Sequence, residues 1–217
     1  MTVGGSLKAL GIGTALSYVV ARVLAGGKHL AYHRYRIVSV PRTGTPAMPR
    51  NHMVRRIDAA ELKTFDIDAP LDVQHRRFGH GLVCLGAFEA GVLVGVNWLA
   101  LGHYDEDEVS VRFLLPDDAA WDTGLWIRPD RRLSRAFAAL WAGTADWLAE
   151  RGLDRSISRI ADYNLTSLNS HRRMQGGTIG TMTVLRLGNV QLAARAQPRV
   201  TRIGRGEPAI VDLRGWP

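Results

Sequence analysis

The sequence contains a single cysteine, Cys84, in 217 residues. One cysteine excludes an internal disulfide framework and any zinc site built from several cysteines. Cys84 lies in the apolar run LVCLGAF, which favours a small buried side chain over a nucleophile. The HExxH, GxSxG, GxGxxG and Walker phosphate-loop patterns are also absent. The sequence therefore predicts no metal site and none of these motif-bearing enzyme classes.

Acidic residues are missing from the first 57 positions, and Asp58 is the first to occur. The same segment carries nine cations: Lys8, Arg22, Lys28, Arg34, Arg36, Arg42, Arg50, Arg55 and Arg56. From residue 58 onward, 19 cations face 20 acids, so the formal charge of +8 belongs to the N-terminal quarter. A nucleic-acid-binding domain would spread its basic residues over the folded body. We therefore expect no nucleic acid partner.

A hydrophobic run long enough to cross a membrane is missing as well. Lys8 and Arg22 bound thirteen uncharged, mostly apolar residues, whereas a spanning helix needs about 20. We expect a helix over residues 7–25 on an anionic membrane surface, with the cations of residues 1–57 near the head groups. The protein would then be cytoplasmic and peripheral on the inner face of the membrane. Packing of this helix on the domain or on a homodimer partner, and a span with both cations at the interface, stay open as alternatives.

The rest of the composition is that of an ordinary folded protein, with 46% hydrophobic and 22% charged residues. The length suggests one domain with a short appendage. The segment PRTGTPAMPRNH (41–52) holds three prolines and a glycine, which indicates a linker or an extended arm. We predict a basic helix and arm over residues 1–52, a compact domain over 53–190 and a peripheral Arg-rich tail over 191–217.

Hydrophobic periodicity predicts the elements of the compact part. Two apolar runs joined at Glu89-Ala90-Gly91 indicate a hairpin over 82–104, whereas the polar segment 68–81 indicates a loop. Apolar residues at helical spacing predict a helix over 134–151, with Ser134 as its N-cap. Asp58 is the candidate N-cap of an earlier helix. Further expected elements are strands over 35–40, 120–129, 155–161 and 178–187 and a short helix over 167–174. This order predicts an α/β (α+β) fold with a mixed, mostly antiparallel central sheet flanked by helices.

One segment combines a strand, a basic turn that follows Pro129 and the start of a helix. A helix N-terminus after such a turn binds phosphate, because its first amide N–H groups lack partners and the helix dipole favours negative charge. Arg131, Arg132 and Arg135 crowd the same turn. A diphosphate ligand is one interpretation of this pattern, and a solvated basic turn is the other.

Two segments resemble the GCN5-related N-acetyltransferase (GNAT) superfamily. LWIRPDRRLSRAFAALW (125–141) is similar to the family's strand–V-x-P-x-x-R-G-x-G-x-G/A–helix segment, whose loop amides hold the coenzyme A pyrophosphate. SRIADYNLTSLNSHRRMQGG (158–177) is similar to the family's ending N-x-x-S/A-x-x-x-Y-x-x-hydrophobic-G. The matching positions, at spacings of 0, 3, 7 and 10, are Asn164, Ser167, His171 and Met174. The hairpin 82–101 resembles the family's central meander, and the resemblance covers roughly residues 54–188.

The resemblance implies an acyl-CoA N-acyltransferase that moves an acyl group from acetyl-CoA, or another acyl-CoA, to an amine. It implies His171 as the general acid for the leaving thiolate and Asp122 as a carboxylate that deprotonates the amine. From the residues alone, Asn164 can also be a helix N-cap, His171 a surface histidine and Asp122 a structural acceptor. The cofactor-binding residues that the resemblance implies are Ile127, Arg132, Leu133, Ser134, Arg135, Ala136, Asn164 and Ser167.

Two segments depart from the family pattern. No glycine occurs between Arg131 and Phe137, so side chains limit how closely a phosphate approaches the amides, although extra arginines can compensate. In the second segment, His171 replaces the usual tyrosine, which changes the identity of any general acid, and Gln175 stands where the family has a glycine. The alternative function is therefore a non-catalytic GNAT-like binding or scaffold module at a membrane surface.

A run of four acids occupies residues 105–108. A solvated loop is the ordinary interpretation of such a run. Attraction of a cationic amine substrate is the functional interpretation. The sequence does not name the acceptor and does not separate acetyl from longer acyl donors.

Overall fold

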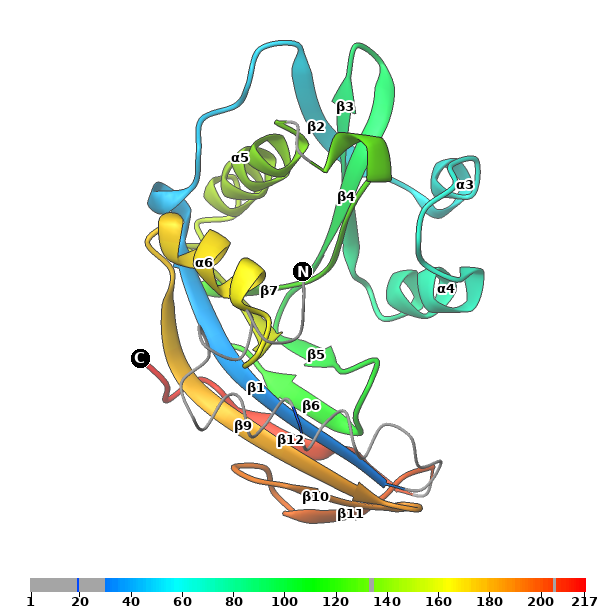
Figure 1. Ribbon diagram of the computed structural model, residues 1–217, viewed down its shortest axis with the longest axis vertical. Coiled ribbons are helices and arrows are strands. Elements are labelled where there is room, and N and C mark those ends of the chain that lie inside the picture. The colour runs from blue at the N-terminus through cyan, green and yellow to red at the C-terminus, as the bar shows by residue number, and fades with distance from the viewer. Residues whose placement is uncertain (1–18, 20–29, 133–134, 205) are drawn as a thin grey trace.

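The computed structural model describes residues 19, 30–132, 135–204 and 206–217. These residues form a nine-stranded sheet, a three-stranded sheet and four α-helices (Figure 1). The large sheet has the order β11-β10-β9-β1-β8-β7-β4-β3-β2, and its neighbours are antiparallel except for β7 and β8. The predicted α+β class with a mostly antiparallel sheet is confirmed. The predicted helix over 7–25 lies, apart from Val19, outside the described residues.

The strands of the large sheet are β1 (Leu30–Pro41), β2 (His52–Ile57), β3 (Val83–Glu89), β4 (Val92–Ala100), β7 (Ala119–Ile127), β8 (Arg155–Ala161), β9 (Gly177–Leu187), β10 (Val190–Ala193) and β11 (Val200–Arg202). The small sheet contains β5 (His103–Asp105), β6 (Val111–Leu114) and β12 (Ala209–Asp212). The α-helices are α3 (Ala59–Leu62), α4 (Leu71–Gly79), α5 (Ala136–Ala149) and α6 (Leu165–Arg173).

The predicted hairpin is β3 and β4, which turn at Ala90 and Gly91, both with positive φ. Asp58 caps α3, because its carboxylate accepts a hydrogen bond from the Glu61 amide at 2.8 Å. Cys84 is buried, as expected, and burial raises the pKa of its thiol to about 12. The loop predicted over 68–81 is wrong, since α4 occupies most of it.

Strand β1 differs from the prediction in length and in place. A short strand over 35–40 was expected in the basic arm, but β1 spans twelve residues and lies between β8 and β9 in the middle of the sheet. Its pairing with β8 runs from Tyr35–Ala161 to Pro41–Arg155. Residues assigned to the arm therefore form part of the folded body, and the boundary near residue 53 cuts through one sheet.

The C-terminal tail is also part of the fold. Strand β12 pairs in parallel with β6, and Val211 and Leu213 are fully buried in the main core. Strands β10 and β11 extend the large sheet beyond β9. The prediction of a peripheral tail is therefore wrong for these segments.

Helices α5 and α6 pack on one face of the large sheet, which we call the α5 face (Figure 1). Leu140 and Leu148 of α5 are fully buried there against β3 and β4. The opposite face, which we call the α4 face, is covered by α3, α4 and the small sheet, with Trp98 and Trp121 fully buried in its core. Within the described ranges, no helix is both long enough and apolar enough to cross a membrane.

Several cations of the basic N-terminal quarter are matched by acids of the folded body. Arg34 lies 3.6 Å from Asp162, and Arg42 lies 3.6 Å from Asp154. Arg55 forms a further ion pair, with Glu61 of α3. Part of the charge attributed to membrane attraction is therefore used within the fold, and membrane attachment through residues 1–57 stays a prediction.

We predict that the close approach of α5 to β2 depends on Gly143. A Cβ at this position would lie 2.3 Å from the Cβ of Val54. Overpacking typically costs about 1–3 kcal/mol, more than the roughly 1 kcal/mol that alanine gains over glycine in a helix. Gly143→Ala should therefore lower the free energy of unfolding in urea.

The matched control is Gly79→Ala in α4, where a Cβ would meet no atom within 4 Å. This variant should be as stable as the wild type or more stable by up to about 1 kcal/mol. If Gly143→Ala behaved like Gly79→Ala, the contact between α5 and β2 would not be tight.

Candidate active site

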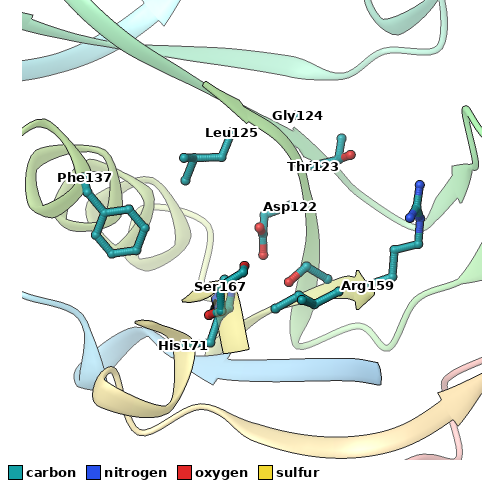
Figure 2. A pocket seen from close by; sticks show the side chains of 10 residues that line it. Asp122, Thr123, Gly124, Leu125, Phe137, Arg159, Ser167 and His171 are labelled. Carbon is teal, nitrogen blue, oxygen red and sulfur yellow. Dashed lines mark hydrogen bonds between the residues drawn. The ribbon is translucent and has the colours of Figure 1, made fainter. Parts of the chain in front are cut away.

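The two parallel strands of the large sheet separate soon after they begin. Strands β7 and β8 pair only from Ala119–Arg155 to Trp121–Ile157. Beyond these pairs β7 stays with β4 while β8 stays with β1. A cavity of about 330 Å³ lies in the split (Figure 2). Its lining residues are Asp122, Thr123, Gly124, Leu125, Phe137, Ser158, Arg159, Ile160, Ser167 and His171.

Strand β7 is irregular at the cavity because of Gly124. Its φ of 58° lies in the left-handed region that favours glycine. The register with β4 shifts here, so that Gly124 and Leu125 face the single residue Asn97. A bulge of this kind bends a strand and redirects its side chains, and it helps to turn β7 away from β8.

His171 reaches the cavity from α6. Its Nδ1 lies 2.8 Å from the carbonyl oxygen of Ser167, and its ring meets Trp141 edge-on at a centroid distance of 5.2 Å. Because a carbonyl only accepts, Nδ1 carries the hydrogen, and in the neutral ring Nε2 is an acceptor. Nε2 is buried and finds no hydrogen-bond partner in the part of the chain that the structure describes. The ring is held in place while one nitrogen stays available.

Asp122 reaches the same cavity from β7 and is 6% exposed. Burial raises the pKa of its carboxyl, and attraction to His171 is the largest opposing effect. The hydroxyls of Ser156 and Ser158 also favour the ionised form, although their contacts fall short of regular hydrogen-bond geometry. Among the described residues, the Oδ2 atom has no hydrogen-bond partner.

Asp122 and His171 face one cavity, and attraction to His171 acts on the Asp122 carboxyl. A pair of this kind can give a proton to one reacting atom and take a proton from another.

The predicted phosphate turn lies at the N-terminus of α5. Pro129–Arg131 form a short 3-10 turn, and Arg135 and Ala136 begin the helix. Arg131 lies 3.2 Å from Glu89, whereas Arg132 and Arg135 are exposed. Within the described residues, these two arginines have no carboxylate partner. Leu133 and Ser134 lie outside the described residues.

The structure brings some of the predicted residues together and separates others. Asp122, Ser167 and His171 line one cavity. Asn164 caps α6 by accepting the Ser167 amide at 3.1 Å and faces a neighbouring cavity. Ile127 is partly buried and packs on the core beneath α5, outside the lining of this cavity.

The sequence analysis missed most of the other lining residues. Phe137 stood out only as one apolar position of α5, and Ser158 and Arg159 only as part of a strand. The glycine at position 124, inside a predicted strand, was a usable signal, because such glycines mark bulges or close backbone approach. Across the described residues, no group of three or more His, Cys, Asp or Glu side chains is arranged to hold a metal ion.

No protein-family model and no curated protein matches the sequence. Solved structures do match. A functionally unknown conserved protein from Staphylococcus epidermidis has a TM-score of 0.54 at 10% identity, over 79% of this chain and 67% of that one. A GNAT-family protein from Novosphingobium aromaticivorans has a TM-score of 0.51 at 11% identity, over 74% and 68%.

A Drosophila protein has a TM-score of 0.50 at 13% identity, over 82% of this chain. The chain spans only 58% of that protein's length. At these identities the comparisons establish the fold and nothing finer. The resemblance to the GNAT superfamily is therefore confirmed at the level of the fold: the chain has a GNAT fold over most of its length.

We predict that Asp122 makes stability depend on pH in a defined direction. Because its pKa is raised in the fold, the native state keeps a proton that the unfolded state has lost. This contribution to the unfolding free energy falls as pH rises from about 4, the usual pKa, by up to about 1.4 kcal/mol per pH unit within the affected window. Asp122→Asn removes the effect, so the variant should gain stability relative to the wild type as pH rises.

Urea unfolding of both proteins from pH 4 to pH 8 measures this difference. Asp146→Asn, at an exposed position of α5, is the matched control. A stability difference between Asp122→Asn and the wild type that stayed constant with pH would contradict the prediction.

Proposed function

We propose that this protein is an acyl-CoA-dependent N-acyltransferase that transfers an acetyl or longer acyl group to an amine. The observation that carries the proposal is the split between β7 and β8, whose cavity is lined by both Asp122 and His171. A GNAT fold alone does not imply catalysis. The argument therefore rests on the residues at the split.

The edges of β7 and β8 at the split suit an extended ligand that carries amides. Past the pairs at Trp121–Ile157, each of these strands keeps a ladder on its outer side only. Backbone groups on the inner side can therefore pair with a ligand as they would with a strand. The pantetheine arm of coenzyme A is an extended chain with two amide groups, which fits this edge.

The diphosphate would lie at the N-terminus of α5. This helix has fourteen residues, and the amides and dipole of a helix N-terminus favour a bound anion. Arg132 and Arg135 supply charge-assisted donors beside them. This turn lies at the end of β7, so one ligand can run from the turn into the split.

The chemistry follows from the proton balance of the pair. An acyl thioester supplies an activated carbonyl carbon and a thiolate leaving group. As the amine nitrogen bonds to that carbon and the carbon–sulfur bond breaks, the amine loses one proton and the sulfur gains one. His171, protonated on Nε2, gives its proton to the sulfur, while the Asp122 carboxylate takes the proton from the amine. The pair thus ends the reaction with one proton, as it began.

The alternative is a GNAT-like module that binds without turnover. The glycine-free turn between Arg131 and Phe137 favours it, because side chains restrict access to the amides. The two functions separate in one set of measurements on the full chain. Isothermal titration with acetyl-CoA and with longer acyl-CoA reports binding, and release of free thiol with a panel of amines reports transfer. Absence of acyl-CoA binding at millimolar concentration would overturn the proposal, and binding without thiol release would favour the alternative.

We predict that Arg132 and Arg135 bind the donor diphosphate. Each charge-assisted contact is worth about 1.5–3 kcal/mol, so replacing both residues by Glu should raise the donor KM at least tenfold. Arg199 and Arg202 are exposed at the far end of the sheet, and their replacement by Glu is the control for net charge. An unchanged donor KM in the first double variant would mean that the diphosphate binds elsewhere.

We predict that His171 acts in the chemical step. His171→Phe should lower kcat by about 10²–10⁴-fold, the usual contribution of a general acid, with little change in acyl-CoA affinity by titration. His171→Tyr restores an acidic proton and should recover part of the loss with a shifted pH profile. His75→Phe, at an exposed site of α4, controls for the loss of a histidine. A wild-type kcat in His171→Phe would contradict a role of His171 in the chemical step and leave it a structural residue.

A further inference from the structure

A second cavity adjoins the split. It has a volume of about 480 Å³, which suits a small molecule. Arg159 of β8 lines both cavities, and Figure 2 shows its side chain directed away from His171 and Phe137. The lining residues of the second cavity are His33, Arg34, Tyr35, Glu108, Arg159, Ala161, Tyr163 and Asn164.

The acidic run at 105–108 contributes to this cavity and is not a solvated loop. Asp105 forms a bidentate pair with Arg112 in the small sheet. Asp107 is bonded to Arg76 and Arg77 of α4. The run is therefore fixed to the fold at two of its four positions by partners outside the cavity.

The other two acids of the run face Arg159. Its Nη2 lies 2.6 Å from Glu106 and 2.9 Å from Glu108, and its guanidinium stacks 4.3 Å above the Tyr35 ring. The Glu106 side chain is 1% exposed, whereas that of Glu108 is 49% exposed. Glu106 is therefore committed to Arg159, and Glu108 is the carboxylate that a ligand can reach.

The two oxygens of Glu108 differ in their partners. Oε2 accepts a hydrogen bond from the Tyr35 hydroxyl at 2.8 Å and meets Arg159. Oε1 lies 3.5 Å from Nδ1 of His33, which is a long contact. Burial lowers the pKa of His33, and Arg159 and the Tyr35 hydroxyl hold the pKa of Glu108 below its usual value. At neutral pH the neighbour of Oε1 is thus a neutral ring, and the carboxylate is ionised.

The charged groups that line this cavity are Arg34, Arg159 and Glu108. Arg159 lies between Glu106 and Glu108, and Arg34, on the adjacent strand, lies 3.6 Å from Asp162. Both lining cations therefore have carboxylate partners, whereas Glu108 is half-exposed and, among the described residues, its Oε1 has only the long contact with His33.

We propose that the second cavity binds the amine acceptor of the proposed acyl transfer, and that it selects acceptors which enter as ammonium cations by bonding them to Oε1 of Glu108. This inference rests on the proposed function and names its substrate class. An ammonium pairs with the half-exposed Glu108 carboxylate and its N–H satisfies Oε1, whereas an anionic group would be repelled by that carboxylate. Free alkylamines and lysine side chains share this chemistry.

Four probes of similar length test the charge preference on the full-length wild type. Butylamine, 1,4-diaminobutane and Nα-acetyl-lysine amide carry an ammonium group without a carboxylate, and 4-aminobutanoate carries both. Isothermal titration without acyl-CoA and initial rates with acetyl-CoA should both favour the first three probes at least tenfold over 4-aminobutanoate. Nα-acetyl-lysine amide bound more weakly than the alkylamines indicates a free small amine, and tighter binding indicates a lysine side chain. Equal affinity for 4-aminobutanoate and butylamine would overturn the proposal.

The variant Glu108→Gln tests the residue. It keeps the shape and an acceptor oxygen but removes the charge, so KM for 1,4-diaminobutane should rise at least tenfold while the acetyl-CoA KM stays unchanged. Glu150→Gln, at an exposed site after α5, is the matched control and should leave both values unchanged. Tyr35→Phe keeps the Glu108 charge and should retain the preference for cations. An unchanged diamine KM in a folded Glu108→Gln protein would overturn the assignment.

The outcomes keep the two proposals apart. Selective diamine binding that is lost in Glu108→Gln, without any acyl transfer, would support the cation site and overturn the proposed enzymatic function. Acyl transfer that ignores both the acceptor charge and Glu108→Gln would support the enzyme and overturn the cation site.

Discussion

The separation of β7 from β8 is the constraint on which the rest of the molecule depends. Neighbouring strands in the interior of a sheet normally satisfy each other's backbone groups along their length. Here the shared hydrogen-bond ladder ends at Trp121 and Ile157. Beyond this point the sheet divides into two halves, or wings, one that contains β7 and one that contains β8. Each wing must be supported by the strand on its outer side, because its inner edge faces a cavity.

The strands on the outer sides are β1, which supports β8, and β4, which supports β7. On one wing, β1 pairs with β8 over seven residues and with β9 on its other side. On the other wing, β4 holds β7 up to Ile127 despite the bulge at Gly124. Helix α5 bridges the two halves on the α5 face, because its Leu140 lies in one hydrophobic cluster with Val94 of β4, and its Trp141 lies in another with Val38 of β1 and Ile160 of β8. The N-terminal strand is thus needed to keep the split open with a fixed shape.

Local pattern was sufficient for the elements whose periodicity is strong. Residues 155–161 alternate and form β8 within the predicted bounds, and the apolar stripe of α5 gave that helix to within two residues at each end. Helix α4 was missed because only Gln74 in it is buried, so it shows little apolar periodicity. The central place of β1 and the burial of Val211 depend on pairing with strands far away in the sequence, which no local pattern records.

In the candidate site, too, the sequence identified single residues but not the contacts between them. His171 and Asp122 were singled out separately, from motif spacing and from a strand position, but nothing in the sequence brought them to one cavity. They meet because strand β7 at Asp122 and helix α6 at His171 line the same cavity in the split. The acids at 105–108 were judged by composition as a solvated run, whereas Arg159 and Arg112 bind three of them. Tertiary pairing of charges cannot be read from a run of like charges.

On the proposed function, the charges sort the two substrates to different sides of the sheet. An acyl-CoA is a polyanion, and the unmatched cations Arg132 and Arg135 lie beyond the end of β7, at the start of α5. The half-exposed carboxylate Glu108 lies beside Tyr35 on the α4 face. Each side therefore repels the substrate of the other, and electrostatic attraction increases only the correct encounter. Between the two sides, Arg159 stays charged because burial is outweighed by its carboxylate partners, which raise its pKa. A cation at this boundary disfavours an ammonium in the split itself. An acceptor that binds at Glu108 as an ammonium would therefore release one proton to solvent before it attacks the thioester as a neutral amine, and the second proton would pass to Asp122 during the transfer.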